Sequence, residues 1–270
     1  YSGHNYELRY WLAASGIDPD REVEIAILPP ADMGNALKAG FIDGYCAGEP
    51  WNTFGVLKRG AHLATVKAAI WKSSPEKVLG VNGRWGDSHP EALAALLTAL
   101  YNASLWCADV ANHEELAILL SGPAYIDKSV EFLRPAVTGE LRIGGQHTQT
   151  VKDFFVPNAK AATFPWKSHA LWFYTQMVRW GQVKHTASHQ RIAGNTYRPD
   201  IYRNALKALG LAMPAASSKV EGALRMETPV GSSGMLTLGP DGFFDGTLFD
   251  PDRIDEYVAA QKNTTDMPTL

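Results

Sequence analysis

The feature that most constrains this chain is a regular alternation of helix-like and strand-like segments within its first 52 residues. Glycine or proline bounds these segments, and the hydrophobic spacing switches between a helical repeat and a strand repeat. The pattern predicts a helix at 4–15, a strand at 23–27, a helix at 31–39 and a strand at 41–47. Strand, helix and strand in short succession indicate a parallel α/β sheet.

The rest of the chain predicts helices more clearly than strands. The expected elements are a helix at 53–58, a strand at 77–82, a long helix opening at the Ser88–Glu91 capping box, a helix at 112–120 and a helix at 167–180. Apolar side chains on the last of these predict a stripe that faces a core. Residues 121–166 read as irregular, and the last sixty residues as loops with one or two short helices.

Composition excludes several classes of protein. A 270-residue chain with 46% hydrophobic residues can bury a large core without disulfides or metal. The formal charge of -3 and the lack of a Lys/Arg run argue against direct nucleic-acid binding. No stretch approaches the length of about 20 apolar residues that a membrane helix needs, so we expect no transmembrane segment. Cys46 and Cys107 are expected in a buried strand and an apolar helix, as small hydrophobic side chains.

Three features resemble metal-binding, phosphate-binding or catalytic motifs, but each lacks residues that such a motif requires. His185 and His189 have the spacing of two metal ligands on a helix, yet no acidic or cysteine partner follows at a recognisable distance. Residues 231–234 lack the lysine and hydroxyl of a phosphate-binding loop. No catalytic triad or Cys/His pair is legible. We therefore predict no catalytic residue, no metal site and no cofactor.

Several motifs resemble those of the nitrate-binding family of bacterial solute receptors. They are residues 2–14, 16–20, 42–52, 75–80 and 165–172, and they follow the family order along nearly the whole chain. The resemblance implies a type II periplasmic-binding-protein fold, in which two α/β lobes enclose a cleft. Members of this family are reversible binders, so the resemblance also implies that the chain is not an enzyme.

The resemblance also implies how the chain divides. Residues 1–72 correspond to an α/β portion of the second lobe, and residues 73–270 return to the first lobe and add C-terminal helices and an extension. Family members carry well over a hundred residues before the equivalent of Tyr1. We therefore expect the N-terminal part of the first lobe to be missing from this sequence.

The start of the first helix is a candidate anion site. Backbone N–H groups of the first turn and the positive end of the helix dipole converge near Gly3 and His4. Gly3 has no side chain to hold a ligand away from the main chain. Lys77 adds a compact positive charge suited to a monovalent oxyanion. By resemblance, nitrate binders have lysine at this position, and bicarbonate binders have an acidic residue and a calcium ion.

Three further side chains are candidates because they lie at predicted strand ends, where clefts in α/β sheets form. Trp51 is expected to wall the cleft, and Pro29 to make a nonpolar contact with a flat anion. Glu49 is expected to orient Lys77 or a backbone turn rather than to touch the anion, because like charge beside the ligand would cost affinity.

These expectations predict reversible binding of nitrate or nitrite, with an ABC permease as partner. The alternative within the family is a cytoplasmic sensor that restrains an RNA-binding antiterminator protein. A bicarbonate binder and an enzyme similar to a thiamine-pyrimidine synthase are the remaining readings. The compartment stays open: periplasmic or membrane-associated for a transport receptor, cytoplasmic for a sensor.

Overall fold

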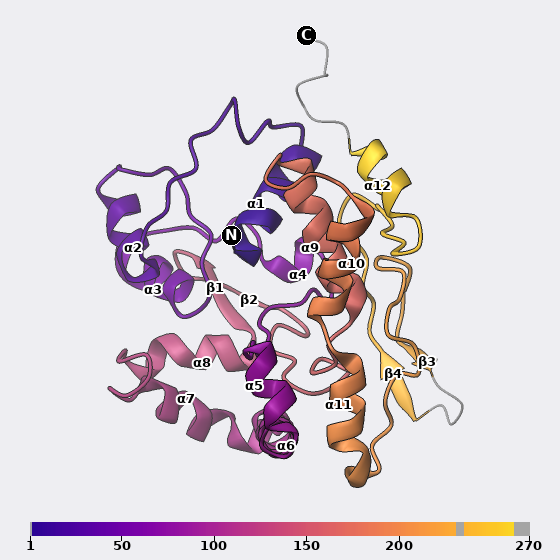
Figure 1. Cartoon of the computed structure of the whole chain (residues 1–270). Coiled ribbons are helices and arrows are strands. Elements are labelled where there is room, and N and C mark those ends of the chain that lie inside the picture. The colour runs from indigo at the N-terminus through magenta and orange to yellow at the C-terminus, as the bar shows by residue number, and fades with distance from the viewer. Residues whose placement is uncertain (1, 231–234, 262–270) are drawn as a thin grey trace.

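The computed structural model describes residues 2–230 and 235–261 (Figure 1). The helices are α1 (Gly3–Ala14), α2 (Pro30–Lys38), α3 (Trp51–Arg59), α4 (Lys67–Ile70), α5 (Gly83–Ser88), α6 (Pro90–Ala108), α7 (His113–Ser121), α8 (Val130–Thr138), α9 (Lys167–Arg179), α10 (Ala187–Thr196), α11 (Pro199–Leu206) and α12 (Ile254–Ala260). Two 3-10 turns, η1 (Val110–Asn112) and η2 (Lys207–Leu209), and four strands, β1 (Glu140–Gly144), β2 (His147–Thr150), β3 (Thr228–Val230) and β4 (Leu236–Leu238), complete the described chain.

The predicted helices form close to their predicted ends. Helices α1, α2, α3, α7 and α9 each begin and end within about two residues of the predicted bounds, the scatter expected of helix termini. The capping box is wrong in detail: α6 begins at Pro90, and Ser88 Oγ instead donates to the Arg84 carbonyl at 2.8 Å. Side chains of α9 do face a core, with Trp172 fully buried.

The three strands predicted at 23–27, 41–47 and 77–82 are absent, and these segments are irregular. A strand is stabilised by ladder hydrogen bonds to a neighbour, and the described residues place no partner strand beside these segments. Their apolar side chains are instead exposed, for example Ile27 at 96% and Phe41 at 84%. Cys46 lies in one of these segments and is exposed, contrary to the prediction, whereas Cys107 is partly buried in α6.

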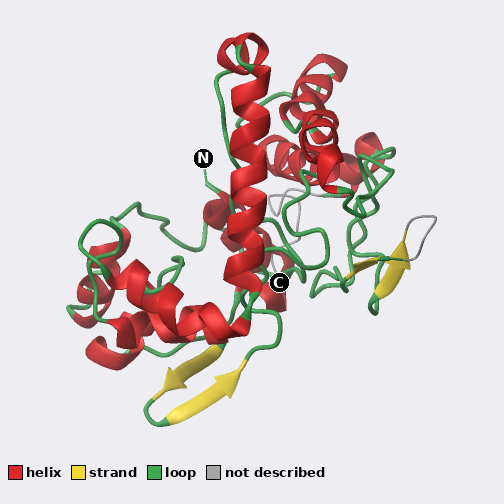
Figure 2. Cartoon of the chain, turned by 90° about the horizontal axis from the view of Figure 1, so that it is seen from below, coloured by secondary structure: helices red, strands yellow, loops and turns green. Residues whose placement is uncertain are grey.

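The strands that do form are two separate antiparallel hairpins (Figure 2). In the first, Leu141 pairs with Gln149, and in the second, Pro229 pairs with Thr237. The first hairpin and α8 both lie in the stretch that was predicted to be irregular, and that prediction is wrong. Helix α8 packs on α7 through Leu116, Ala117, Phe132, Leu133 and Val137.

The main core joins segments from both ends of the chain. Tyr6 and Tyr10 of α1 pack with Trp71, with Trp172 of α9 and with Phe243. The Trp71 and Phe243 rings are stacked at 4.7 Å between centroids, and Tyr10 Oη donates to Asp245 at 2.8 Å. This core fixes the start of α1 and the chain around Trp71 relative to each other. The lobe boundary at residue 72 stays a prediction.

Helix α6 carries an exposed apolar surface. An 18-residue window within its 19 residues has a mean hydropathy of 1.2, and 6% of that window is buried. The expectation that no segment approaches the length of a membrane helix was therefore too strong. Length and composition alone are weak grounds for a membrane span, because other apolar helices pass the same test. Leu96, Leu100, Leu105 and Trp106 are its exposed large side chains.

Candidate functional site

The first turn of α1 is capped in a way that leaves its opening amides facing outward. The Ser2 hydroxyl accepts a hydrogen bond from the Asn5 amide at 3.2 Å, so the cap serves only one of the N–H groups of the first turn. A Cβ added at Gly3 would lie 3.7 Å from Phe173 Cζ, an ordinary contact. The helix start therefore retains the donors and the dipole that favour an anion.

Four charged or titratable side chains meet beside this helix start. Glu76 is their centre: its Oε1 atom lies 3.6 Å from His4 Nε2, and its Oε2 atom accepts a hydrogen bond from Lys67 Nζ at 2.6 Å. Lys77 donates to the other oxygen of the same carboxylate. We call His4, Lys67, Glu76 and Lys77 the charged corner. The structure thus brings two predicted residues, His4 and Lys77, to a common partner.

The pKa values in the charged corner reflect its partial burial. Burial lowers the pKa of His4, and the carboxylate of Glu76 partly offsets this effect. Burial would raise the pKa of Glu76, but hydrogen bonds and charge from Lys67 and Lys77 outweigh it and bring the pKa to about 2. Glu76 is therefore a carboxylate throughout the physiological pH range.

Glu7 and Lys67 are site residues that sequence reasoning missed. Glu7 lies one helical turn after His4 and is buried, and Lys67 Nζ approaches its Oε1 atom to 3.0 Å. Burial raises the pKa of Glu7 to about 7, although the charge of Lys67 opposes the shift. The spacing from His4 to Glu7 places both on one helix face, and this was the available signal. Nothing in the local sequence marks Lys67.

The turn at residues 48–51 approaches the charged corner through its glycine. A Cβ added at Gly48 would lie 3.9 Å from His4 Cε1. The Glu49 carboxylate points elsewhere and accepts a hydrogen bond from the Thr53 amide at 3.1 Å, where it caps α3. Trp51 opens α3 beneath the Lys128 ammonium, 5.6 Å from the ring centre. Within the described residues, no hydrogen bond or ion pair joins Glu49 or Trp51 to Lys77.

Pro29 is exposed and precedes α2. The segment before it is not a strand, so the placement of Pro29 at a strand end is wrong. Its contact with an anion, like the roles given to Gly3, His4, Glu49, Trp51 and Lys77, stays a prediction.

A second cluster of charged groups is buried between α9 and the chain around residue 221. Lys219 forms ion pairs with Glu221 and with Asp241, and Ser168 Oγ donates to Glu221 Oε1 at 2.6 Å. Burial disfavours the Glu221 carboxylate, but His169 and Lys219 outweigh it and lower its pKa to about 2. Both carboxylates share Lys219 as their cation, which indicates a structural network.

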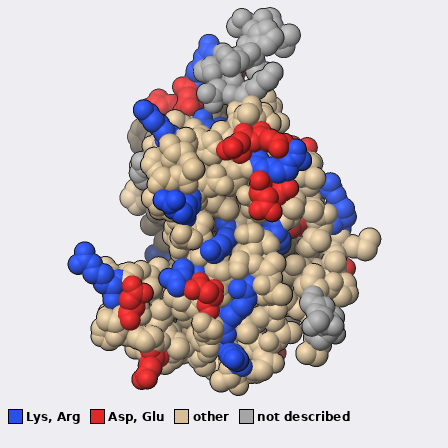
Figure 3. Space-filling view, turned by 45° about the vertical axis from the view of Figure 1, so that its right-hand side comes forward, with Lys and Arg blue, Asp and Glu red and all other residues tan. Residues whose placement is uncertain are grey.

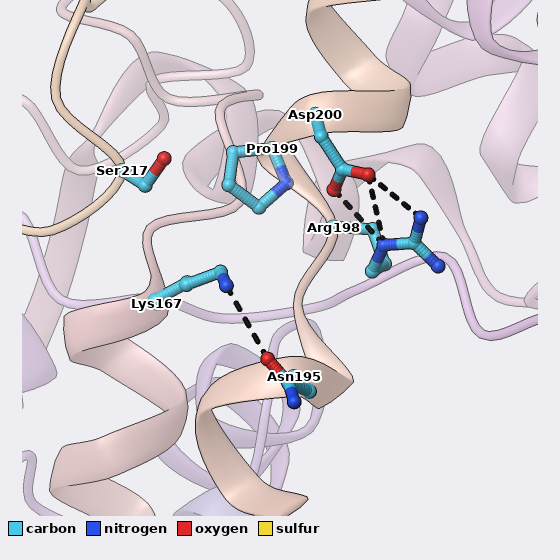
Figure 4. Close-up of a pocket in the computed structure, with 6 residues that line it drawn as sticks. All are labelled: Lys167, Asn195, Arg198, Pro199, Asp200 and Ser217. Atoms are coloured by element: carbon cyan, nitrogen blue, oxygen red, sulfur yellow. Dashed lines mark hydrogen bonds and ion pairs between the residues drawn. The ribbon is translucent and has the colours of Figure 1, made fainter. Parts of the chain in front are cut away.

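A surface cavity of about 410 Å³ lies between the ends of α9, α10 and α11 (Figure 4). Its positive groups are Lys167 and Arg198. The Arg198 guanidinium is held by Asp200, with Nη2 and Oδ2 2.6 Å apart, and Lys167 Nζ lies 3.5 Å from Asn195 Oδ1. Arg198 is thus paired with Asp200, which leaves Lys167 as the lining cation without an acidic partner in this cavity.

The remaining motifs that drew notice have ordinary structural roles or fall outside the described residues. His185 Nε2 contacts Asp255 Oδ1 at 2.6 Å, and its other ring nitrogen contacts the Tyr174 hydroxyl. His189 contacts the Lys184 carbonyl. The Gly231–Gly234 segment lies outside the described residues. On the face in Figure 3, basic and acidic side chains lie beside each other at several places.

Comparison with known proteins connects this chain to anion receptors. Residues 1–121 match the NMT1-like family. The chain is 34% identical over 265 residues to the nitrate/nitrite binding protein NrtA of Synechococcus elongatus, which covers 96% of this chain and 55% of the relative. It is 30% identical over 270 residues to the bicarbonate-binding protein CmpA of Synechococcus sp., covering 97% of this chain and 56% of that protein.

A transport ATPase also contains a similar region. The nitrate import ATP-binding protein NrtC of Synechocystis sp. is 35% identical over 210 residues, which is 77% of this chain and 31% of NrtC. The chain therefore spans about half the length of the curated binding proteins that it matches, and less of the ATP-binding protein.

The fold agrees with a solved structure. The crystal structure of the periplasmic nitrate-binding protein NrtA from Synechocystis PCC 6803 matches with a TM-score of 0.83 and 30% identity, over 96% of this chain and 64% of that one. Over the part that it spans, the chain therefore has the type II periplasmic-binding-protein fold. The predicted fold class is confirmed, although the described residues contain no parallel sheet.

Proposed function

Since this chain is a relative, in sequence and in fold, of the nitrate-binding and bicarbonate-binding solute receptors, we propose that it forms part of a receptor that reversibly binds nitrate or nitrite. Binding needs no covalent chemistry. The anion is held between charged side chains and helix amides, and its contacts with both lobes shift the protein towards a closed form that a partner reads.

The observation that carries this proposal is the charged corner at the start of α1. Two lysines and His4, the second residue of the helix, converge there on one carboxylate. Ammonium groups and amide donors match the charge and the acceptor oxygens of a small monovalent oxyanion.

Lysine at position 77 favours nitrate or nitrite over bicarbonate. In the resemblance described above, bicarbonate binders have an acidic residue there and use calcium as the cation. A bicarbonate receptor is the second candidate function, because a bicarbonate-binding protein is among the relatives.

The partner we propose is the permease of an ABC importer. The similar region within a nitrate import ATP-binding protein supports this choice, because it places such a domain inside a transport ATPase. A cytoplasmic sensor acting on an antiterminator is the alternative. The solved relative is a periplasmic nitrate-binding protein, which supports a transport receptor.

The test is thermal unfolding of the protein expressed from its native gene, with each anion added in turn. A ligand that binds only the folded state raises the melting temperature by mass action. We expect nitrate and nitrite to raise it, and bicarbonate with calcium to raise it little. A larger rise with bicarbonate and calcium would establish the second candidate instead.

A further inference from the structure

The charged corner already holds an anionic group. The Glu76 carboxylate contacts positive or titratable groups from three separate elements: His4 in α1, Lys67 in α4 and its neighbour Lys77 in the loop. Building on the proposed receptor function, we propose that Glu76 occupies the anion site in the ligand-free protein, and that nitrate or nitrite binds by displacing the Glu76 carboxylate. The bound anion then contacts Lys67 as well as Lys77.

The chemistry of the two anions supports an exchange. A carboxylate and nitrate are both planar and carry one delocalised negative charge. In each, the oxygens that accept hydrogen bonds are bonded to the same central atom. Each prefers ammonium and imidazole donors, with which charge-assisted hydrogen bonds are the strongest. The groups that hold Glu76 can therefore hold the ligand without rearranging.

The position of Glu76 allows it to leave. It lies in the irregular loop between α4 and α5, and its side chain is 47% exposed, so water can solvate its carboxylate when nitrate takes over its contacts with the lysines. Lys67 cannot leave as easily. Its side chain is only 25% exposed, against 78% for Lys77, and it also contacts the buried Glu7 carboxylate. Lys67 therefore stays in place as a fixed cation when Glu76 moves.

Displacement lowers the apparent affinity in a calculable way. When a competing state fills the site, the apparent Kd equals the intrinsic Kd divided by the fraction of open molecules. If Glu76 fills the site in about nine of ten molecules, the observed Kd is about tenfold weaker than the intrinsic value.

Glu76→Gln tests the displacement, because the amide keeps the shape of the side chain but loses its charge. Calorimetry with nitrate on the protein expressed from its native gene should show binding about tenfold tighter than in the wild type. The matched control is Glu131→Gln, whose carboxylate is 48% exposed and lies 3.0 Å from Lys58 far along the chain. The control should not change the Kd. Unchanged or weaker binding by Glu76→Gln would overturn the proposal.

Lys67 needs a double variant, because its removal alone would leave the Glu7 carboxylate buried without a cation. Lys67→Met with Glu7→Gln removes both charges together, and Glu7→Gln alone is the reference. We expect the double variant to bind nitrate at least about thirtyfold more weakly than the reference, as for loss of one partner of a desolvated charge pair. Equal affinity in the two proteins would remove Lys67 from the site.

A ligand-free measurement separates this proposal from the receptor function. The Glu76 charge raises the pKa of His4 against the effect of burial, so Glu76→Gln should lower the His4 pKa measured by NMR, and Glu131→Gln should not. An unchanged His4 pKa would show that Glu76 does not occupy the corner. Failure of the wild type to bind nitrate, with the His4 shift present, would instead count against the proposed function.

Discussion

At the scale of single residues, we predict that Lys77 is the cation that distinguishes nitrate from bicarbonate. Lys77→Glu puts a second carboxylate beside Glu76, so it repels an anion. We expect nitrate binding to weaken by about 2–5 kcal/mol, the cost of losing one partner of a charge pair that the closed site desolvates. Calorimetry on the folded variant measures this loss. Lys38→Glu, at the exposed end of α2, is the control and should bind normally.

Glu221 makes stability depend on pH. Its folded pKa is about 2, against an ordinary value of 4.5. A carboxyl group with a lowered folded pKa contributes its full stability above the unfolded pKa, and this contribution is lost as the pH falls from about 4.5 towards 2. Glu221→Gln should therefore cost about 3 kcal/mol at pH 7, since it breaks a buried charge network.

Chemical denaturation at pH 7, 5 and 3 measures this effect. The gap in unfolding free energy between wild type and Glu221→Gln should be the same at pH 7 and pH 5 and should narrow at pH 3. Glu256→Gln removes an exposed ion-pair partner of Arg253. Its unfolding free energy should equal that of the wild type at all three pH values. A gap that is constant down to pH 3 would show that the ionised form of Glu221 is not what stabilises the fold.

Sequence reasoning reached part of the site. His4 and Lys77 were found because a helix start and a family motif mark them. No role was predicted for Glu76 or for Lys67. The contact between Lys67 and Glu7 joins residues sixty positions apart through the packing of α4 on α1, which no local pattern encodes.

At the scale of elements, the close packing of the Tyr45 ring on α3 depends on glycine. A Cβ at Gly55 would lie 2.0 Å from the Tyr45 hydroxyl oxygen, which donates to the Trp51 carbonyl. Gly55→Ala must displace that ring. We expect a net loss of about 1–2 kcal/mol, because the overpacking outweighs the gain in helix propensity.

Thermal unfolding of Gly55→Ala beside Gly194→Ala measures this cost. A Cβ at Gly194 in α10 would lie 3.6 Å from Leu171 Cδ2, an ordinary contact. Gly194→Ala should therefore raise the melting temperature by removing a flexible residue from a helix. If Gly55→Ala is also stabilising, Tyr45 does not hold the place that the structure gives it.

The predicted helices α1, α2, α3, α7 and α9 formed and the predicted strands did not, for a physical reason. A helix such as α1 satisfies its backbone within one segment, so its apolar spacing and its terminal Gly16 are sufficient signals. A strand needs a neighbour. Residues 23–27 alternate correctly, yet Ile27 is almost fully exposed in the absence of a described partner. The hairpin of β1 and β2 was missed because its strands are short and polar.

At the scale of the whole molecule, the exposed apolar side chains of α6 should make the 270-residue chain associate with itself. Exposed apolar side chains bind other apolar surfaces and hydrophobic dyes. We expect self-association in sedimentation and enhanced fluorescence of an anilinonaphthalene dye. Leu96→Lys with Leu100→Lys should reduce both, because these side chains are exposed and their loss costs little stability.

The control is Ile192→Lys on α10, which removes a side chain that is exposed outside this surface. It should leave association unchanged. A chain that stays monomeric and dye-free without any substitution would show that α6 is covered by another part of the molecule in solution.

The hydrogen bond between Tyr10 and Asp245 spans 235 positions of sequence, and this separation sets when α1 can fold stably. Synthesis proceeds at about 5–20 residues per second, so about 10–50 s pass between the two residues leaving the ribosome. Long-range contacts of this kind also slow folding, because a large loop must close before any contact compensates. The start of α1 therefore gains this contact only after residue 245 has been synthesised, and until then its tyrosines are available to chaperones.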